Sequence, residues 1–203
     1  MKPAKLFPMF LKLTDRPCLV AGAGTIGESK IASLLEADAK VRVVAPKATA
    51  QVGSWAKANR IEWMARPWEP GDLDEMFLVV AATSSTEVHE RIFEEATRRG
   101  VLCNIVDVPD LCDFYYPAVV QRGALQIAIS TTGQSPALAQ RLRKELEDQF
   151  GIEYETWLEQ LGEERDKLFS ETMNPEERKR LLHDLAGAEA FRAFMRKRNK
   201  AKK

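Results

Sequence analysis

A glycine-rich segment close to the N-terminus has residue types and a spacing that could bind a phosphate group. Gly22-Ala23-Gly24-Thr25-Ile26-Gly27 reads GxGxxG, after an apolar run at 17–22 and at the start of a helix-like segment at 27–37. In this setting the first glycine permits a tight turn, the second lets the backbone approach a pyrophosphate, and the third allows close packing of helix on strand. Unpaired N–H groups at the helix start then bind the anion. The segment predicts dinucleotide binding; a glycine-rich turn that binds no nucleotide is the alternative.

The end of the second predicted strand bears on which dinucleotide is bound. An acidic residue normally stands there and binds the ribose hydroxyls of NAD. Here the chain reads Val44-Ala45-Pro46-Lys47, so the acid is missing, and Lys47 could favour a 2′-phosphate. Ala45 and Pro46 are predicted to contact the cofactor. So is Thr83, whose alternative role is a helix N-cap with Ser84 or Ser85 nearby. This pattern alone leaves NAD and NADP open.

Strand-like and helix-like runs alternate around these residues. Short apolar or β-branched runs predict strands at 17–22, 40–46, 61–64, 77–82 and 101–106. The first of them is followed by the helix at 27–37, and a helix at 87–99 ends at Gly100. Such alternation is typical of an α/β fold with a mainly parallel sheet. We therefore predict a Rossmann-type dinucleotide-binding domain over residues 1–113.

The pattern changes after this region. Residues 124–131 resemble one more strand, and Ser135-Pro136 is a helix start signal for a helix to about Phe150. Residues 151–203 contain no strand-like run, and Asn174-Pro175 is a second helix start. We predict a small segment at 114–150 followed by a helical C-terminal domain at 151–203.

Composition narrows the classes of partner. The formal net charge of zero does not favour nucleic acid or a membrane surface. No apolar run reaches the roughly 18 residues of a membrane span, and no signal-peptide core follows the N-terminus. Three cysteines without a CxxC and two histidines argue against a structural metal site. We expect a cytoplasmic protein with no nucleic-acid, membrane or metal partner.

Several segments, in one collinear order over about residues 3–147, resemble the precorrin-2 dehydrogenases of the sirohaem-synthase N-terminal type. Besides the glycine loop they are Leu6 to Leu13, Val43 to Pro46, Ala81 to Thr83, Asn104 to Asp107, Phe114 to Ala118 and Ala128 to Ala139. The resemblance implies oxidation of precorrin-2 to sirohydrochlorin with NAD rather than NADP, and a homodimer assembled through the 114–150 segment. Some members of the family also insert iron.

Asp107 is the residue that the resemblance ties to dehydrogenation. It ends a predicted parallel strand, and ligands in open α/β sheets bind beyond the carboxyl ends of strands. A carboxylate near the nicotinamide could take up a proton as general base. The alternative is a turn-forming aspartate before Val108-Pro109.

The substrate that the resemblance implies is a tetrapyrrole with many carboxylates, so its site should offer anion partners. The candidates are Arg122, Ser130, Thr131, Thr132 and Arg141. Thr132 stands where the family usually has glycine, which is a departure from its pattern. Two other function classes remain open. One is an NAD(H)-sensing module without turnover, and the other is an iron chelatase, alone or as an added activity.

Overall fold

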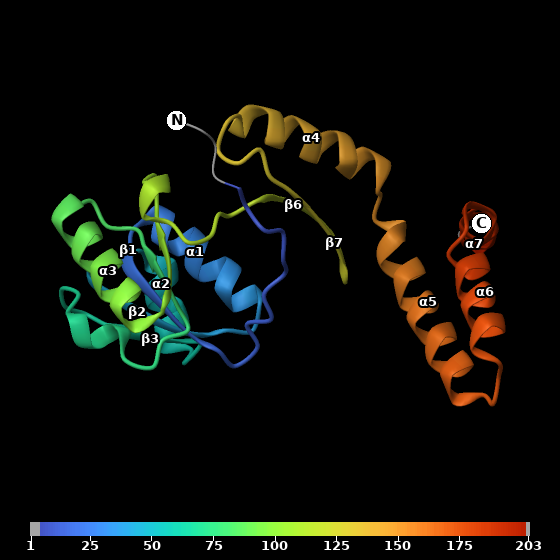
Figure 1. The fold of residues 1–203 in the computed structure, drawn as a ribbon, viewed down its shortest axis with the longest axis horizontal. Coiled ribbons are helices and arrows are strands. Elements are labelled where there is room, and N and C mark those ends of the chain that lie inside the picture. The colour runs from blue at the N-terminus through green and yellow to red at the C-terminus, as the bar shows by residue number, and fades with distance from the viewer. Residues whose placement is uncertain (1–4, 202–203) are drawn as a thin grey trace. The chain divides into compact units, whose positions relative to one another are not determined.

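A computed structural model describes residues 5–201 of the chain (Figure 1). The chain divides after Tyr116 into two compact units. This division lies close to the boundary that the sequence predicts after residue 113. The segments predicted at 114–150 and 151–203 fall into the second unit, apart from residues 114–116.

The first unit contains a five-stranded parallel sheet. Its order is β3-β2-β1-β4-β5, with β1 spanning Pro17–Ala23, β2 Lys40–Ala48, β3 Ile61–Met64, β4 Leu78–Ala81 and β5 Leu102–Ile105. The chain thus starts at the centre, builds outward through β2 and β3, and then returns to the other side of β1. This order confirms the predicted Rossmann-type sheet, because its two halves diverge at the β1–β4 switch point.

Alternation of side chains along β1 assigns each face of the sheet to different helices. Val20 packs with buried residues of α1 (Thr25–Glu36) and α2 (Ala50–Lys57), whereas its neighbour Leu19 packs with those of α3 (Thr86–Arg99). Both faces are therefore covered, which explains why the strands are apolar runs rather than alternating ones. Gly100 ends α3 with a left-handed φ of 68°, as predicted.

The helix α2 is an element that sequence reasoning missed. It has eight residues, and only Val52 among them is buried, so its apolar periodicity is too short to detect. Its N-cap, Thr49, accepts a hydrogen bond from the Val52 N–H at 3.3 Å. A local signal for the helix start was therefore present.

The second unit begins with an antiparallel hairpin of β6 (Ala118–Arg122) and β7 (Leu125–Ile129). Four helices follow: α4 (Pro136–Gln149), α5 (Glu153–Ser170), α6 (Pro175–Leu185) and α7 (Ala188–Ala201). Ser135 and Asn174 cap α4 and α6 by accepting backbone N–H groups at 3.2 and 2.9 Å, so both predicted helix starts are confirmed. The strand β6 was not predicted.

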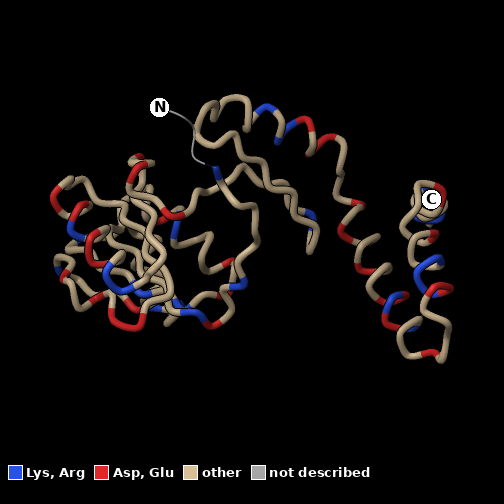
Figure 2. Tube along the Cα trace, viewed as in Figure 1, with Lys and Arg blue, Asp and Glu red and all other residues tan. Residues whose placement is uncertain are grey.

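Positively and negatively charged residues are interspersed along the Cα trace of both units (Figure 2). None of the helices in residues 5–201 has the length and hydropathy needed to cross a membrane.

Candidate dinucleotide and substrate site

The glycine loop joins β1 to α1 and meets the end of β4. Gly22 has a left-handed φ of 104°, and a Cβ atom on it would lie 2.4 Å from the Ala82 carbonyl oxygen. A Cβ on Gly27 would lie 2.2 Å from the Gly22 carbonyl oxygen. Real Cβ atoms essentially never approach so closely, so the fold itself requires glycine at both positions.

Gly24 differs from the other two glycines of the motif. It is exposed, its φ is negative, and a Cβ on it would meet nothing within 4 Å. The fold therefore does not require glycine here, and the open space beside the backbone suits a ligand that approaches closely. Gly24 is also the N-cap of α1, whose first turn receives no side-chain cap. The N–H groups of that turn are available to a pyrophosphate, so these residues fit a dinucleotide.

The end of β2 departs from the sequence prediction. The strand does not stop at Pro46 but continues to Ala48, which pairs with Ala23 of β1 beyond a bulge. Proline is tolerated here because the pairing of β2 with β3 ends at Val44. Ala45 is buried and Pro46 is exposed, and their contact with a cofactor stays a prediction.

Thr83 lies in the loop between β4 and α3. The alternative that Thr83 caps α3 is wrong, because Ser85 is the N-cap and accepts the Val88 N–H at 3.3 Å. The Thr83 hydroxyl accepts the Ser85 N–H at 3.4 Å instead. Contact of Thr83 with a cofactor ribose stays a prediction.

His89 is a residue of this site to which sequence reasoning assigned no role. It is buried on α3, and its Nε2 atom donates a hydrogen bond of 2.9 Å to the Thr83 carbonyl oxygen. His89 thereby fixes the loop that faces Gly22 across the end of the sheet. Its spacing to Ile92 and Ala96 on the buried face of α3 was the available signal.

Asp107 follows the carboxyl end of β5 in an exposed turn. Its φ is 63°, and the Val108 N–H donates to the Ile105 carbonyl oxygen at 3.2 Å. The predicted turn role therefore describes its backbone, while its carboxylate remains open to solvent. Because β1, β4 and β5 are neighbouring parallel strands, one edge of the sheet carries Gly22 near the end of β1, and Thr83 and Asp107 just after the ends of β4 and β5.

A returning segment supports this edge. The buried Asn104 side chain donates to the Phe114 carbonyl oxygen at 2.7 Å. The Asp113 carboxylate accepts the Cys103 N–H at 2.9 Å, and the Asp113 N–H donates to the Cys103 carbonyl oxygen at 2.8 Å. Residues 112–114 therefore run back along β5 and lead to Tyr116, the last residue of the first unit.

The predicted substrate-binding residues all belong to the second unit. Thr132 has a left-handed φ of 55°, and its N–H donates to the Ser130 hydroxyl at 3.1 Å. The Thr131 hydroxyl accepts the Ser135 N–H at 3.2 Å. A positive φ explains why glycine is customary at the position of Thr132. The three hydroxyl residues thus form one turn before α4, and substrate contact by them stays a prediction.

The two predicted arginines have partners within the second unit. The Arg122 guanidinium donates to the Phe150 and Glu147 carbonyl oxygens at 2.8 and 3.1 Å, and so satisfies the carboxyl end of α4. Arg141 pairs with Glu145 at 3.2 Å on the exposed face of that helix. These contacts give Arg122 a structural role that its sequence position did not reveal.

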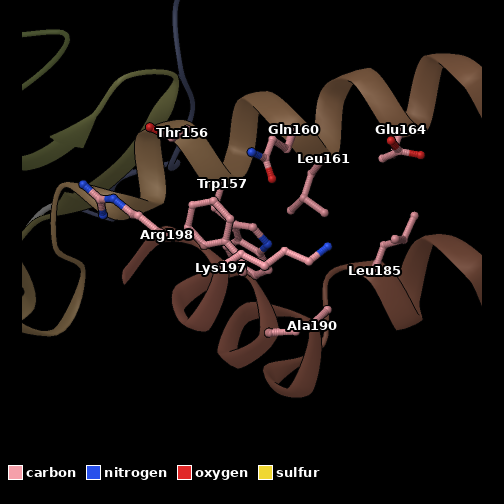
Figure 3. Close-up of a pocket in the computed structure, with 11 residues that line it drawn as sticks. Thr156, Trp157, Gln160, Leu161, Glu164, Leu185, Ala190, Lys197 and Arg198 are labelled. Atoms are coloured by element: carbon pink, nitrogen blue, oxygen red, sulfur yellow. The ribbon is translucent and has the colours of Figure 1, made fainter. Parts of the chain in front are cut away.

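A cavity of about 600 Å³ lies within the second unit, between α5, α6 and α7 (Figure 3). Apolar side chains form much of its lining, among them Trp157, Leu161, Leu185 and Phe194. None of the predicted site residues lines it. In residues 5–201 no group of three or more His, Cys, Asp or Glu side chains could hold a metal ion.

The first unit is a Rossmann-type dinucleotide-binding fold with an open glycine loop. Its sequence agrees with this geometry, because the family described as "Putative NAD(P)-binding" matches residues 9–118. The chain belongs to this family. A second family description, "Sirohaem biosynthesis protein central", matches residues 122–149.

Individual proteins that resemble this chain are siroheme synthases and a precorrin-2 dehydrogenase. The chain is 42% identical over 140 residues to "Siroheme synthase 1" of Cronobacter sakazakii and 39% identical over 141 residues to "Siroheme synthase" of Neisseria meningitidis. These matches cover 69% and 70% of the chain but only 30% and 29% of the relatives. The chain thus matches about a third of their length. The solved structure "SirC, precorrin-2 dehydrogenase" superposes with a TM-score of 0.80 and 25% identity, covering 96% of this chain and all of that one.

The contrast among the glycines gives a first prediction. Gly24→Val should abolish NAD⁺ binding and leave the thermal midpoint near that of the parent, because the added side chain projects into open space that the pyrophosphate would occupy. Gly22→Ala should instead destabilise the protein by about 2 kcal/mol or more, because its Cβ would collide with backbone at a positive φ. Calorimetric NAD⁺ titration and thermal unfolding of both variants check this, and unchanged affinity in Gly24→Val contradicts it.

Proposed function

We propose that this protein oxidises precorrin-2 to sirohydrochlorin with NAD⁺ as the hydride acceptor. The observation that carries the proposal is the likeness to the solved precorrin-2 dehydrogenase over the full length of that chain. The matches to siroheme synthases and to the sirohaem family description at 122–149 support the same reaction. The open glycine loop and the exposed Asp107 carboxylate on one sheet edge supply the groups it needs.

The reaction removes a hydride and a proton from the tetrapyrrole. NAD⁺ accepts the hydride and becomes NADH, and the proton needs a separate acceptor. The loop from Gly22 to Gly27 would hold the pyrophosphate, with Ala45, Pro46 and Thr83 beside the rest of the dinucleotide. Asp107 would take the proton as general base, and its exposure lets the proton pass on to water.

Asp107→Asn gives the test of this function. The variant should retain NAD⁺ binding and the parent thermal midpoint, because asparagine also adopts a left-handed φ. NADH formation from precorrin-2 should fall by about 10²- to 10⁴-fold, the usual loss on removing a general base. Asp110→Asn is the matched control, since Asp110 is also exposed and lies on the same loop.

Two other outcomes would distinguish this function from its alternatives. A folded Asp107→Asn variant with a rate within about threefold of the parent would show that the carboxylate is not the base. A parent protein that binds NADH tightly but forms none from precorrin-2 would instead favour the sensing module.

We also propose that NAD⁺ is preferred over NADP⁺, despite Lys47 after the second strand. The preference rests on the resemblance to the precorrin-2 dehydrogenases, and Lys47 itself is exposed and forms no ion pair within residues 5–201. The expected kcat/KM is higher with NAD⁺, and Lys47→Gln should leave it within about twofold because an exposed charge contributes little. A higher kcat/KM with NADP⁺ would overturn this preference.

A homodimer assembled through the 114–150 segment is part of the proposal. In the described chain β6 and β7 pair only with each other, so each strand keeps one free edge. Val119 on β6 and Leu138 on α4 are large apolar side chains that are 37% and 38% exposed. Unpaired edges and exposed apolar side chains favour association with another copy. Sedimentation velocity at micromolar concentration should show a dimer, and a monomer there would refute the proposal.

A cytoplasmic location remains a prediction. Cys18, Cys103 and Cys112 are all free, and reduced thiols are usual in that compartment.

A further inference from the structure

Lys30 is a half-buried cation of the first unit that has no assigned role. It lies on α1, the helix that starts in the glycine loop. Its Nζ atom lies 3.7 Å from the centroid of the Tyr116 ring. Lys30 therefore joins the phosphate-binding helix to the end of the segment that returns along β5.

The Tyr116 side chain that Lys30 contacts is neutral. The Tyr116 hydroxyl is buried without a hydrogen-bond partner among the described residues, and this burial, together with nearby Cys18, raises the pKa of Tyr116 to about 12. The phenol therefore stays protonated at neutral pH. Its ring attracts the ammonium through its π face but does not neutralise the charge.

Lys30 also lacks a direct counter-ion. In the part of the chain that the structure describes, thirteen residue pairs form salt bridges, and Lys30 belongs to none of them. Burial lowers the pKa of Lys30, and attraction to Asp107 opposes that change. Asp107 forms no direct ion pair with Lys30 among the described residues. A partly dehydrated ammonium in this state gains more from an incoming anion than a fully exposed one does.

We propose that Lys30 binds a carboxylate of the substrate and so contributes to the affinity for the tetrapyrrole. The inference rests on the proposed function, which requires a substrate with many carboxylates near Asp107. The Tyr116 ring would contact one side of the ammonium, and the substrate carboxylate would pair with the other side. Lys30 lies more than one helical turn beyond the start of α1, so the pyrophosphate at that helix end is a different anion.

Three variants test this role. Lys30→Gln removes the charge, Lys30→Arg keeps it, and Lys57→Gln removes an exposed lysine of the same unit as the matched control. Binding of uroporphyrin, an octacarboxylate porphyrin, to the cofactor-free protein is measured by fluorescence anisotropy. Steady-state NADH formation from precorrin-2 and calorimetric NAD⁺ titration are measured on the same preparations.

We expect Lys30→Gln to weaken uroporphyrin binding and to raise the KM for precorrin-2 by about tenfold, as loss of one charge-assisted hydrogen bond would. Its kcat should stay within about twofold of the parent, and its affinity for NAD⁺ should be unchanged. Lys30→Arg and Lys57→Gln should both bind uroporphyrin like the parent. This split between KM and kcat is not expected if Lys30 acts only on Asp107 or on folding.

Four results would overturn the inference. They are parent-like uroporphyrin binding by Lys30→Gln, an equal loss in Lys57→Gln, a loss of NAD⁺ affinity in Lys30→Gln, and a folded Lys30→Arg that binds as weakly as Lys30→Gln. A parent that forms no NADH from precorrin-2 but binds uroporphyrin in a Lys30-dependent way would refute the proposed function and leave the carboxylate site standing.

Discussion

The close approach of backbone to backbone where β1, β4 and α1 converge is the constraint on which the site depends. Side chains at Gly22 and Gly27 would collide with carbonyl oxygens at 2.4 and 2.2 Å. Only glycine at these positions lets α1 begin directly at the end of β1 and lets the loop after β4 lie beside it. The helix start is therefore uncapped and open, which is the condition for binding an anion there.

Buried hydrogen bonds also hold the loop after β4 and the segment beside β5, which lie at the same edge of the sheet as the glycine loop. His89 fixes the Thr83 carbonyl, and Asn104 ties β5 to the segment that leads to Tyr116. The exposed Asp107 thus follows a strand, β5, that a buried hydrogen bond ties to its neighbouring segment.

Much of the fold could be predicted from sequence because both faces of the sheet are covered. Burial of both faces makes each strand an apolar run, and α3 between β4 and β5 ends at a glycine, Gly100. In the second unit, α4 and α6 begin at the capping residues Ser135 and Asn174. The elements that sequence reasoning missed are those whose sequence signals are weak. In α2 one residue is buried, and Pro46 interrupts a strand that has no neighbour to pair with at that point.

The sequence by itself determined the glycine loop, the parallel sheet and the carboxylate after β5, because these follow from local residue types and periodicity. Only the tertiary structure decided which side chains meet. Arg122 reads as an anion partner, yet its guanidinium satisfies the carbonyl groups at the end of α4. Lys30 has no feature in the sequence that marks it, yet it lies over Tyr116 from a distant part of the chain. Such contacts depend on how the returning segment packs against β5 and α1, and no spacing along the chain encodes that packing.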